Sequence, residues 1–379
     1  THDGTRAERL VQQLQFFCPE LQVHLFPAWD VLPFDRVSPS PDIVSRRLST
    51  LERITRQEEE PLFLVTTINA LSQRVPTKDF IKEHILKLAV GREIRVERLL
   101  RWLANQGYLR TGTVRESGEF AVRGGIIDIF PSGRLAPIRI DLFGSQIESM
   151  HRFDPESQLR TKAIKGFILL PATEYGLDGR TTAQFRQKYL ARFGASASDD
   201  PMLEAISAGQ RFRGAEHLLP LFHDHLTTLT DFTSFSEIYM TELSLAAADE
   251  RRGEITDYHQ ARLHQEGRGD TYRLIQPKEL YLSENDWTQL QDQSTILTAD
   301  IRPEADHITQ FDGKRTKDYT SERKQKGTNI FSVFVQDLLE ILSTKKVILA
   351  CHTEGSRDRM MALLRDQGFE RAVAADSWL

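Results

Sequence analysis

Three histidines near the middle of the chain have the spacing that comes closest to a metal site. His217 precedes a His-x-His pair formed by His223 and His225. Such a pair can bind zinc when a third ligand converges on it. No cysteine and no HExxH motif accompanies the three histidines, and the apolar residues 218–222 run between them. We therefore expect loop and strand-edge histidines, and no metal-binding residues in this chain.

A second stretch imitates the strand that positions magnesium in nucleotide-hydrolysing enzymes. Residues 243–248 are apolar or small, and Asp249 and Glu250 follow them. The stretch is rich in alanine and continues into Arg251 and Arg252, so a helix is the better interpretation. The phosphate-binding motif GxxxxGK[ST], whose backbone amides and lysine hold the phosphates, does not occur. We therefore predict no catalytic residues and no cofactor-binding residues here.

The strand expected over residues 138–143 carries the most informative pattern, IRIDLF. Side chains alternate across a strand, so its three aliphatic residues share one face, which we expect to be core. The opposite face then carries Arg139, Asp141 and Phe143. A phenylalanine on a polar face is costly to leave in water without a reason.

The neighbouring strand, residues 119–123, supports the same interpretation. Phe120 and Val122 point to one side and Arg123 to the other, so pairing of the strands would place Arg123, Arg139 and Phe143 on one exposed surface. Arginine beside an exposed aromatic ring is the composition of an interface hot spot. The alternative is that Phe143 turns under a loop while the arginines pair with Glu119 and Asp141. The two strands alone favour neither.

The elements around these strands predict an α/β protein with several domains. Residues 1–85 alternate helix and strand, which indicates the first half of an α/β domain, and we expect a further strand before its first helix. Residues 86–170 combine one helix with glycine-punctuated strands, typical of a small α+β domain with a mostly antiparallel sheet. Residues 171–298 would complete the α/β domain. We expect a polar linker at 299–326 and a partial small α/β domain at 327–379, with strands at 347–350 and 372–375 around a helix.

Charge is unevenly distributed along the 379 residues. The net charge of −5 argues against a protein that binds nucleic acid over its whole surface. Residues 86–170 nevertheless carry 14 Lys and Arg against 9 Asp and Glu, and most of the cations are arginines. Such a basic region is either a contact surface or a solvated face.

Two further properties bear on where the protein works. No apolar run approaches the roughly 18 residues that a membrane span requires, so we expect no membrane partner. The two cysteines, Cys18 and Cys351, are far apart and form no CxxC pair. This usage fits a reducing cytoplasm and excludes a disulfide scaffold.

Several motifs of the chain resemble the bacterial transcription-repair coupling factor family. They include FPAWDVLPFD at 26–35, GEFAVRGGIIDIFP at 118–131, RIDLF at 139–143 and LLPA at 169–172. The resemblance is dense over about residues 20–175, thinner to 290, and resumes at 354–359. The damage-recognition helicase UvrB shares this N-terminal architecture and could be confused with it, but UvrB carries a Tyr-rich hairpin where residues 26–49 are short and Tyr-free.

The resemblance implies a fold and a function. The fold is a degenerate helicase-like (UvrB-like) α/β domain with the basic α+β domain inserted, and the basic domain binds UvrA through the positions Arg123, Arg139 and Phe143. It also implies that a C-terminal domain of the parent protein masks this surface. RNA polymerase, DNA, ATP and magnesium would be bound by other domains of the parent, which is an ATP-driven DNA translocase. The implied role is to recruit nucleotide excision repair to stalled transcription.

Two other interpretations stay open. The chain could be part of a UvrB-type helicase, which a phosphate-binding loop upstream of Thr1 would favour. Alternatively, the basic domain could bind DNA directly. A salt titration separates DNA binding from protein docking, since phosphate-driven binding falls steeply with salt.

Overall fold

The computed structural model describes residues 1–56, 62–194, 197, 199–233, 235–264, 273–297, 316–320 and 329–375. Two compact units can be distinguished. The main unit contains residues 1–15 and 19–299, and the C-terminal unit contains residues 16–18 and 300–379. The mixture of helices and sheets confirms the predicted α/β class.

The main unit begins with an alternation of helices and parallel strands. In chain order these are α1 (Gly4–Phe17), β1 (Gln22–Phe26), α2 (Pro41–Arg56) and β2 (Leu62–Thr66). Proline is the first residue of α2 and Asp42 lies in its first turn, as expected at a helix N-terminus. β1 and β2 pair in parallel. Thr1 adds to the end of β2, because its amino group donates to Thr66 O at 2.7 Å and its carbonyl accepts from Ile68 N–H at 3.0 Å.

Helices of four to 22 residues and a second parallel pair of strands make up most of the remaining main unit. The helices are α3 (Ile68–Leu71), α4 (Lys78–Glu83), α6 (Gly179–Phe193), α7 (Pro201–Ser207), α8 (Leu219–Phe222), α9 (Leu229–Phe232), α10 (Glu242–Leu263), α11 (Pro277–Leu280) and α12 (Glu284–Asp292). A 3-10 turn, η2 (Ala215–Leu218), precedes α8. The parallel pair consists of β11 (Ile238–Thr241) and β12 (Ser294–Leu297).

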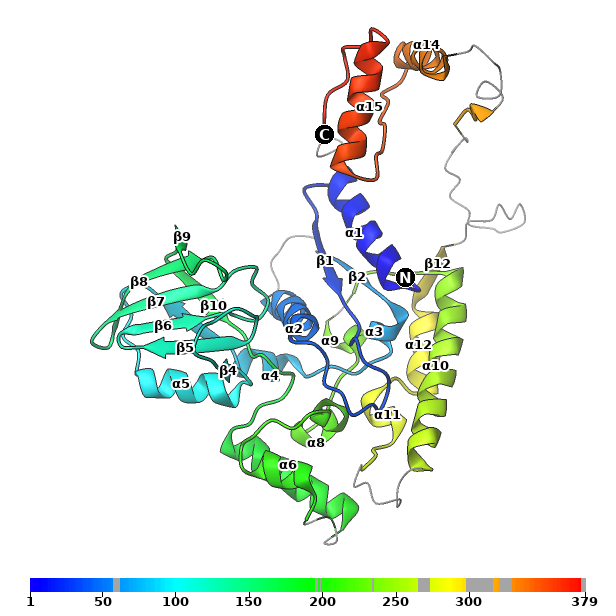
Figure 1. Ribbon diagram of the computed structural model, residues 1–379. Coiled ribbons are helices and arrows are strands. Elements are labelled where there is room, and N and C mark those ends of the chain that lie inside the picture. The colour runs from blue at the N-terminus through cyan, green and yellow to red at the C-terminus, as the bar shows by residue number, and fades with distance from the viewer. Residues whose placement is uncertain are drawn as a thin grey trace. The chain divides into compact units, whose positions relative to one another are not determined.

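A six-stranded sheet occupies the middle of the chain. Its order is β4 (Leu109–Arg110), β5 (Glu119–Arg123), β6 (Ile126–Ile129), β7 (Ile138–Phe143), β8 (Gln146–Phe153) and β9 (Arg160–Ala163). All pairs are antiparallel except β4 with β5, as the sequence predicted for most of the sheet. Helix α5 (Val96–Asn105) lies along one face (Figure 1), with Leu99 and Leu103 in the core beneath it. A separate antiparallel pair joins β3 (Leu86–Ala89) and β10 (Gly166–Leu169).

The hydrophobic cores of the main unit are divided according to the part of the chain that supplies their residues. The core under the six-stranded sheet uses buried residues between Leu88 and Ala172. The two larger cores of the main unit instead combine residues from before position 86 with residues from after position 170. These two halves of the chain, far apart in sequence, therefore bury their apolar surfaces together.

A buried ion pair joins the same two halves. Arg47 of α2 donates through Nε to Glu174 Oε1 at 2.5 Å, and the side chains are 0% and 1% exposed. The Arg47 guanidinium also lies over the Phe26 ring, 4.4 Å from its centroid. Trp29 Nε1 donates to the same carboxylate at 3.3 Å. Burial of this charge is tolerated because the pair is hydrogen-bonded and stacked.

The C-terminal unit contains α14 (Ile330–Leu342) and α15 (Glu354–Asp366) around a small core. The strands expected at 347–350 and 372–375 are not formed, although Val347 and Ala372 pack against that core. A strand requires a neighbour for its backbone hydrogen bonds, and the described part of this unit provides none. The predicted linker at 299–326 falls almost entirely outside the described residues.

Candidate docking surface

The strand register places two of the predicted residues on one face of the six-stranded sheet. Arg123 on β5 lies opposite Ile126 on β6, which lies opposite Asp141 on β7. In the next row, Asp128 on β6 lies opposite Arg139 on β7. Ile138 and Ile140 point to the other face, where they are buried under α5. Arg123 and Arg139 therefore share the face away from α5, which we call the outer face.

Phe143 ends β7 on this outer face and is 76% exposed. The irregularity between Asp141 and Leu142 places the extra residue on β8, so the alternation of β7 continues through Phe143. Leu142, the preceding residue, packs on the core side. The alternative that Phe143 turns under a loop is wrong.

Two hairpin tips bring Phe143 close to the end of β5. The β5–β6 hairpin turns at Gly124 and Gly125, and the β7–β8 hairpin turns at Gly144, whose φ of 62° favours glycine. Leu142 N–H donates to Gly125 O at 2.8 Å. A Cβ on Gly125 would lie 3.1 Å from Leu142 O, so a small residue allows this close approach. Arg123 and Phe143 thus lie at the same end of the sheet.

Arg123 is exposed but oriented by a loop. Its Nη2 donates to Thr113 Oγ1 at 2.8 Å and also to Gly112 O. Within the described residues, no carboxylate forms an ion pair with it, and Glu119 instead accepts from the N–H groups of Arg115 and Glu116. The Arg123 charge is therefore available to an anionic partner.

Arg139 behaves differently, because only 15% of its side chain is exposed. Its Nε and Nη2 donate to the two carboxylate oxygens of buried Asp128 at 2.8 and 2.9 Å. Its Nη1 donates to Gln158 O at 3.2 Å, and its guanidinium lies over the Phe153 ring at 4.7 Å. The hydrogen bonds to Asp128 raise the pKa of Arg139.

The predicted ion-pair partners of the arginines were wrong in identity. Asp141 binds Arg160 at 2.8 Å and Ser149 Oγ at 2.6 Å instead of an arginine of the proposed trio. Asp128 lies in the apolar run IIDI, which hid its role as the partner of Arg139. The cross-strand register was the missing signal.

Two of the three histidines are buried, and the expectation of loop and strand-edge positions was wrong for His217, which lies in η2, whereas His223 and His225 lie in a loop. His217 is 1% exposed and contacts the edge of Trp29, and His223 Nε2 lies 2.8 Å from Glu174 O. Burial lowers the pKa of both His217 and His223 to about 4. Among the residues that the structure describes, no group of three or more His, Cys, Asp or Glu could hold a metal ion. Asp249 and Glu250 lie within α10, as the helical interpretation predicted.

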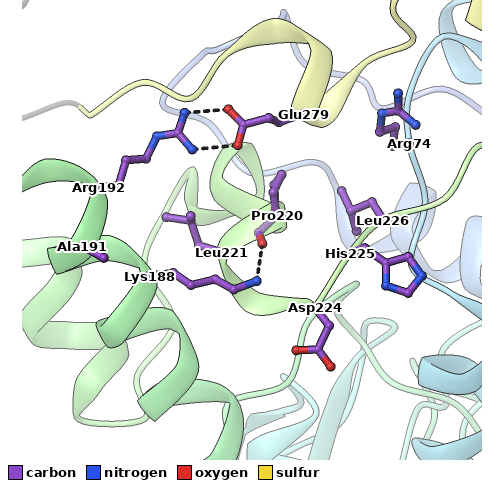
Figure 2. Close-up of a pocket in the computed structure, with 10 residues that line it drawn as sticks. All are labelled: Arg74, Lys188, Ala191, Arg192, Pro220, Leu221, Asp224, His225, Leu226 and Glu279. Carbon is purple, nitrogen blue, oxygen red and sulfur yellow. Dashed lines mark hydrogen bonds and ion pairs between the residues drawn. The ribbon is translucent and has the colours of Figure 1, made fainter.

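A shallow pocket of the main unit contains the exposed third histidine, His225 (Figure 2). Its cations are already engaged: Arg192 forms two hydrogen bonds with Glu279, at 2.6 and 2.7 Å, and Lys188 donates to Pro220 O at 3.4 Å. Burial lowers the pKa of Lys188. This arrangement ties α6 to α8 and α11, and it leaves the outer face of the sheet as the better candidate site.

Comparison with known proteins bears on that face. The UvrB interaction domain family matches residues 86–175, which include the whole six-stranded sheet. Transcription-repair-coupling factors of Rickettsia bellii and Rickettsia conorii are 32% and 30% identical over 300 and 372 residues, covering 78% and 96% of this chain. The Escherichia coli factor is 32% identical over 58% of the chain.

The chain belongs to the transcription-repair-coupling factor family. It spans 26% and 32% of the length of the two Rickettsia factors. In this member of the family, Arg123, Arg139 and Phe143 all lie within the UvrB interaction domain. None of the described helices is both long and apolar enough to cross a membrane.

Proposed function

We propose that this chain docks UvrA through the outer face of its UvrB interaction domain, and thereby links stalled transcription to nucleotide excision repair. The observation that carries the proposal is Phe143, which is 76% exposed at the same end of the sheet as Arg123, an arginine that forms no ion pair among the described residues. An aromatic anchor next to an arginine is the composition of a binding hot spot. α5 covers the opposite face, and Val114 packs with Ala121 and Phe153 on the outer face, so the exposed end at Phe143 is the part of this sheet left for a partner.

The rest of the chain supports a scaffold role in this proposal. Residues 1–85 and 171–298 together form a degenerate helicase-like domain, into which residues 86–170 are inserted. The shared cores and the Arg47–Glu174 pair support this division. We further propose that the residues that the structure describes form no ATP site, and that ATP hydrolysis, magnesium and the contacts to RNA polymerase and DNA belong to other domains of the parent. Titration calorimetry that detects micromolar ATP affinity would contradict this part.

The test of docking pairs a titration of UvrA with a thermal melt of each variant. Phe143→Ala should weaken binding about thirtyfold or more, because truncating a central anchor costs about 2 kcal/mol. Its melting temperature should stay close to that of the wild type. Phe63→Ala, which truncates a 42%-exposed phenylalanine on β2, is the matched control and should bind normally.

Two results would overturn the proposal. One is a Phe143→Ala variant that melts many degrees lower while its folded population still binds UvrA. The other is that the wild type binds duplex DNA instead of UvrA and loses this binding steeply at high salt, which indicates a phosphate-binding surface.

We also propose that a C-terminal domain of the parent covers this face, so the present chain should bind UvrA more tightly than its full-length parent.

A further inference from the structure

Arg139 has few hydrogen-bonding groups left for a partner. Four contacts occupy its guanidinium: two with Asp128, one with Gln158 O and one with the Phe153 ring. A residue engaged in this way can still affect binding, but it does so through what it holds in place. What Arg139 holds is the turn formed by residues 154–159.

This turn is fixed by several hydrogen bonds and contains a strained residue. Asp154 N–H donates to Leu159 O at 2.9 Å, and Gln158 N–H donates to Asp154 O at 2.8 Å. Gln158 has a φ of 62°, a left-handed conformation that non-glycine residues rarely adopt. Its side chain also donates to Val114 O at 3.1 Å. Such conformations persist where the surrounding structure enforces them, and they cluster at functional positions.

The residue that this turn presents is Leu159, which is 69% exposed. A single exposed leucine is ordinary on a protein surface, so its surroundings decide its significance. The next residue, Arg160, binds Asp141, which lies between Arg139 and Phe143 on the outer face of β7. Arg160 pairs with Phe153, whose N–H donates to Pro137 O, so Leu159 lies about 20 Å along the strand direction from Phe143. Both apolar side chains therefore fit within the roughly 800 Å² that one partner contributes to a standard interface.

We propose that Leu159 is a second apolar anchor of the docking surface, and that Arg139 is a positioning residue that holds the turn of residues 154–159. The inference rests on the proposed docking of UvrA and adds a contact to it. The surface then consists of two apolar anchors, Phe143 and Leu159, separated by the polar strip of Asp141 and Arg160. The matching surface of UvrA should carry two apolar pockets with polar groups between them.

The first experiment titrates UvrA with Leu159→Ala and with Leu109→Ala. Leu109 is the matched control, because it is 61% exposed and lies on β4, the strand at the opposite edge of the same sheet. Leu159→Ala should weaken binding about tenfold with an unchanged melting temperature, whereas Leu109→Ala should bind like the wild type. Equal affinity of the two variants for UvrA would overturn the proposal that Leu159 is a second anchor.

The second experiment tests how Arg139 acts. Arg139→Lys keeps the positive charge but loses the paired hydrogen bonds of the guanidinium to Asp128. Gln158→Gly loosens the turn of residues 154–159 and leaves the Arg139–Asp128 pair in place. Each substitution should lower the affinity for UvrA. When either is combined with Leu159→Ala, the double variant should bind only slightly more weakly than Leu159→Ala alone, because all three substitutions act through the Leu159 contact. Additive losses for Arg139→Lys, together with normal binding of Gln158→Gly, would show that Arg139 touches the partner directly.

Phe143→Ala separates this inference from the function on which it rests. If Phe143→Ala loses binding while Leu159→Ala does not, docking stands and the second anchor is wrong. If neither variant loses binding, or the wild type does not bind UvrA, both proposals fail.

Discussion

Two arginine–carboxylate pairs in this molecule have the same chemistry and different surroundings. Arg47 pairs with Glu174 and lies 4.4 Å from the Phe26 ring centroid, while Arg139 pairs with Asp128 and lies 4.7 Å from the Phe153 ring centroid. The first pair is enclosed between two distant halves of the chain. The second lies at the rim of an exposed sheet face, where 15% of the Arg139 side chain reaches solvent.

The difference shows how burial decides what such a pair can do. A fully enclosed pair can only hold the core together, and removal of one partner leaves an uncompensated buried charge. A pair at the rim can hold nearby surface residues in a binding arrangement while the sheet beneath remains stable. Stability should therefore depend most on Arg47, and partner binding on the outer face around Arg139. Four experiments test this contrast.

The largest expected effect is on stability at Arg47. Arg47→Met should lower the free energy of unfolding by about 3–5 kcal/mol, because Glu174 would be left buried and unpaired. Chemical denaturation followed by circular dichroism measures the change. Glu174→Gln added to Arg47→Met should recover part of the loss. A loss below about 1 kcal/mol would mean that the buried pair does not hold the core together.

A smaller loss of stability is expected at Arg139. Arg139→Glu places a carboxylate against buried Asp128 and removes charged hydrogen bonds that each contribute about 1.5–3 kcal/mol. Thermal melting should therefore show a clear decrease, together with loss of UvrA binding. The exposed position that strand alternation alone assigns to Arg139 would instead imply a loss of binding with the fold intact. A variant that melts like the wild type would restore that simpler interpretation.

Acid should destabilise the interior that surrounds the first pair. The pKa of His217 and of His223 is about 4 in the folded protein and about 6.5 in a free side chain. The unfolded chain thus binds more protons in this window, and stability falls as the pH drops from 6.5 towards 4. Burial raises the pKa of Glu216, which opposes this trend at the acid end.

Melts between pH 4 and 7.5 measure this effect, and His223→Gln should flatten the dependence. Hydrogen exchange should show the regions around His217 and His223 losing protection before β6 and β7 of the sheet. Simultaneous loss in both regions would contradict the contrast between them.

The smallest effect is expected at Arg123. Arg123→Ala should weaken UvrA binding by about 1 kcal/mol, since an exposed charge beside an anchor contributes less than the anchor itself. Its melting temperature should not change. Arg110→Ala, which removes an exposed arginine from edge strand β4, is the control for net charge. Equal effects of the two variants would assign the loss to long-range attraction instead of a local contact.

Sequence reasoning succeeded where the result depended on the backbone alone. The period of two along β5 and β7 placed Arg123, Arg139 and the exposed Phe143 without knowledge of any partner strand. It failed where contacts between distant segments decide the result. The pairing of Arg139 with Asp128 depends on the β6–β7 register, and the burial of His217 depends on Trp29 from far earlier in the chain.

The strands predicted at 347–350 and 372–375 show the same limit. Their composition is suitable for strands, but a strand forms only when a neighbour pairs with it. The local sequence pattern determines which secondary structure a segment is able to form, and the rest of the fold determines whether that structure forms. For the outer face, local pattern was enough to predict an exposed Phe143 and not enough to find Asp128 as the partner of Arg139.

The position of Phe143 at a hairpin end has a consequence for the thermodynamics of association. Its backbone is already fixed by pairing with Gln146 on β8, and Leu142 next to it is hydrogen-bonded to Gly125. Docking therefore needs to restrict only the side-chain torsions of Phe143, a cost of about 0.5–1.5 kcal/mol. A preformed anchor of this kind changes complexes mainly through their lifetime. Loss of the ring should thus appear as faster dissociation of UvrA, with the rate of encounter almost unchanged.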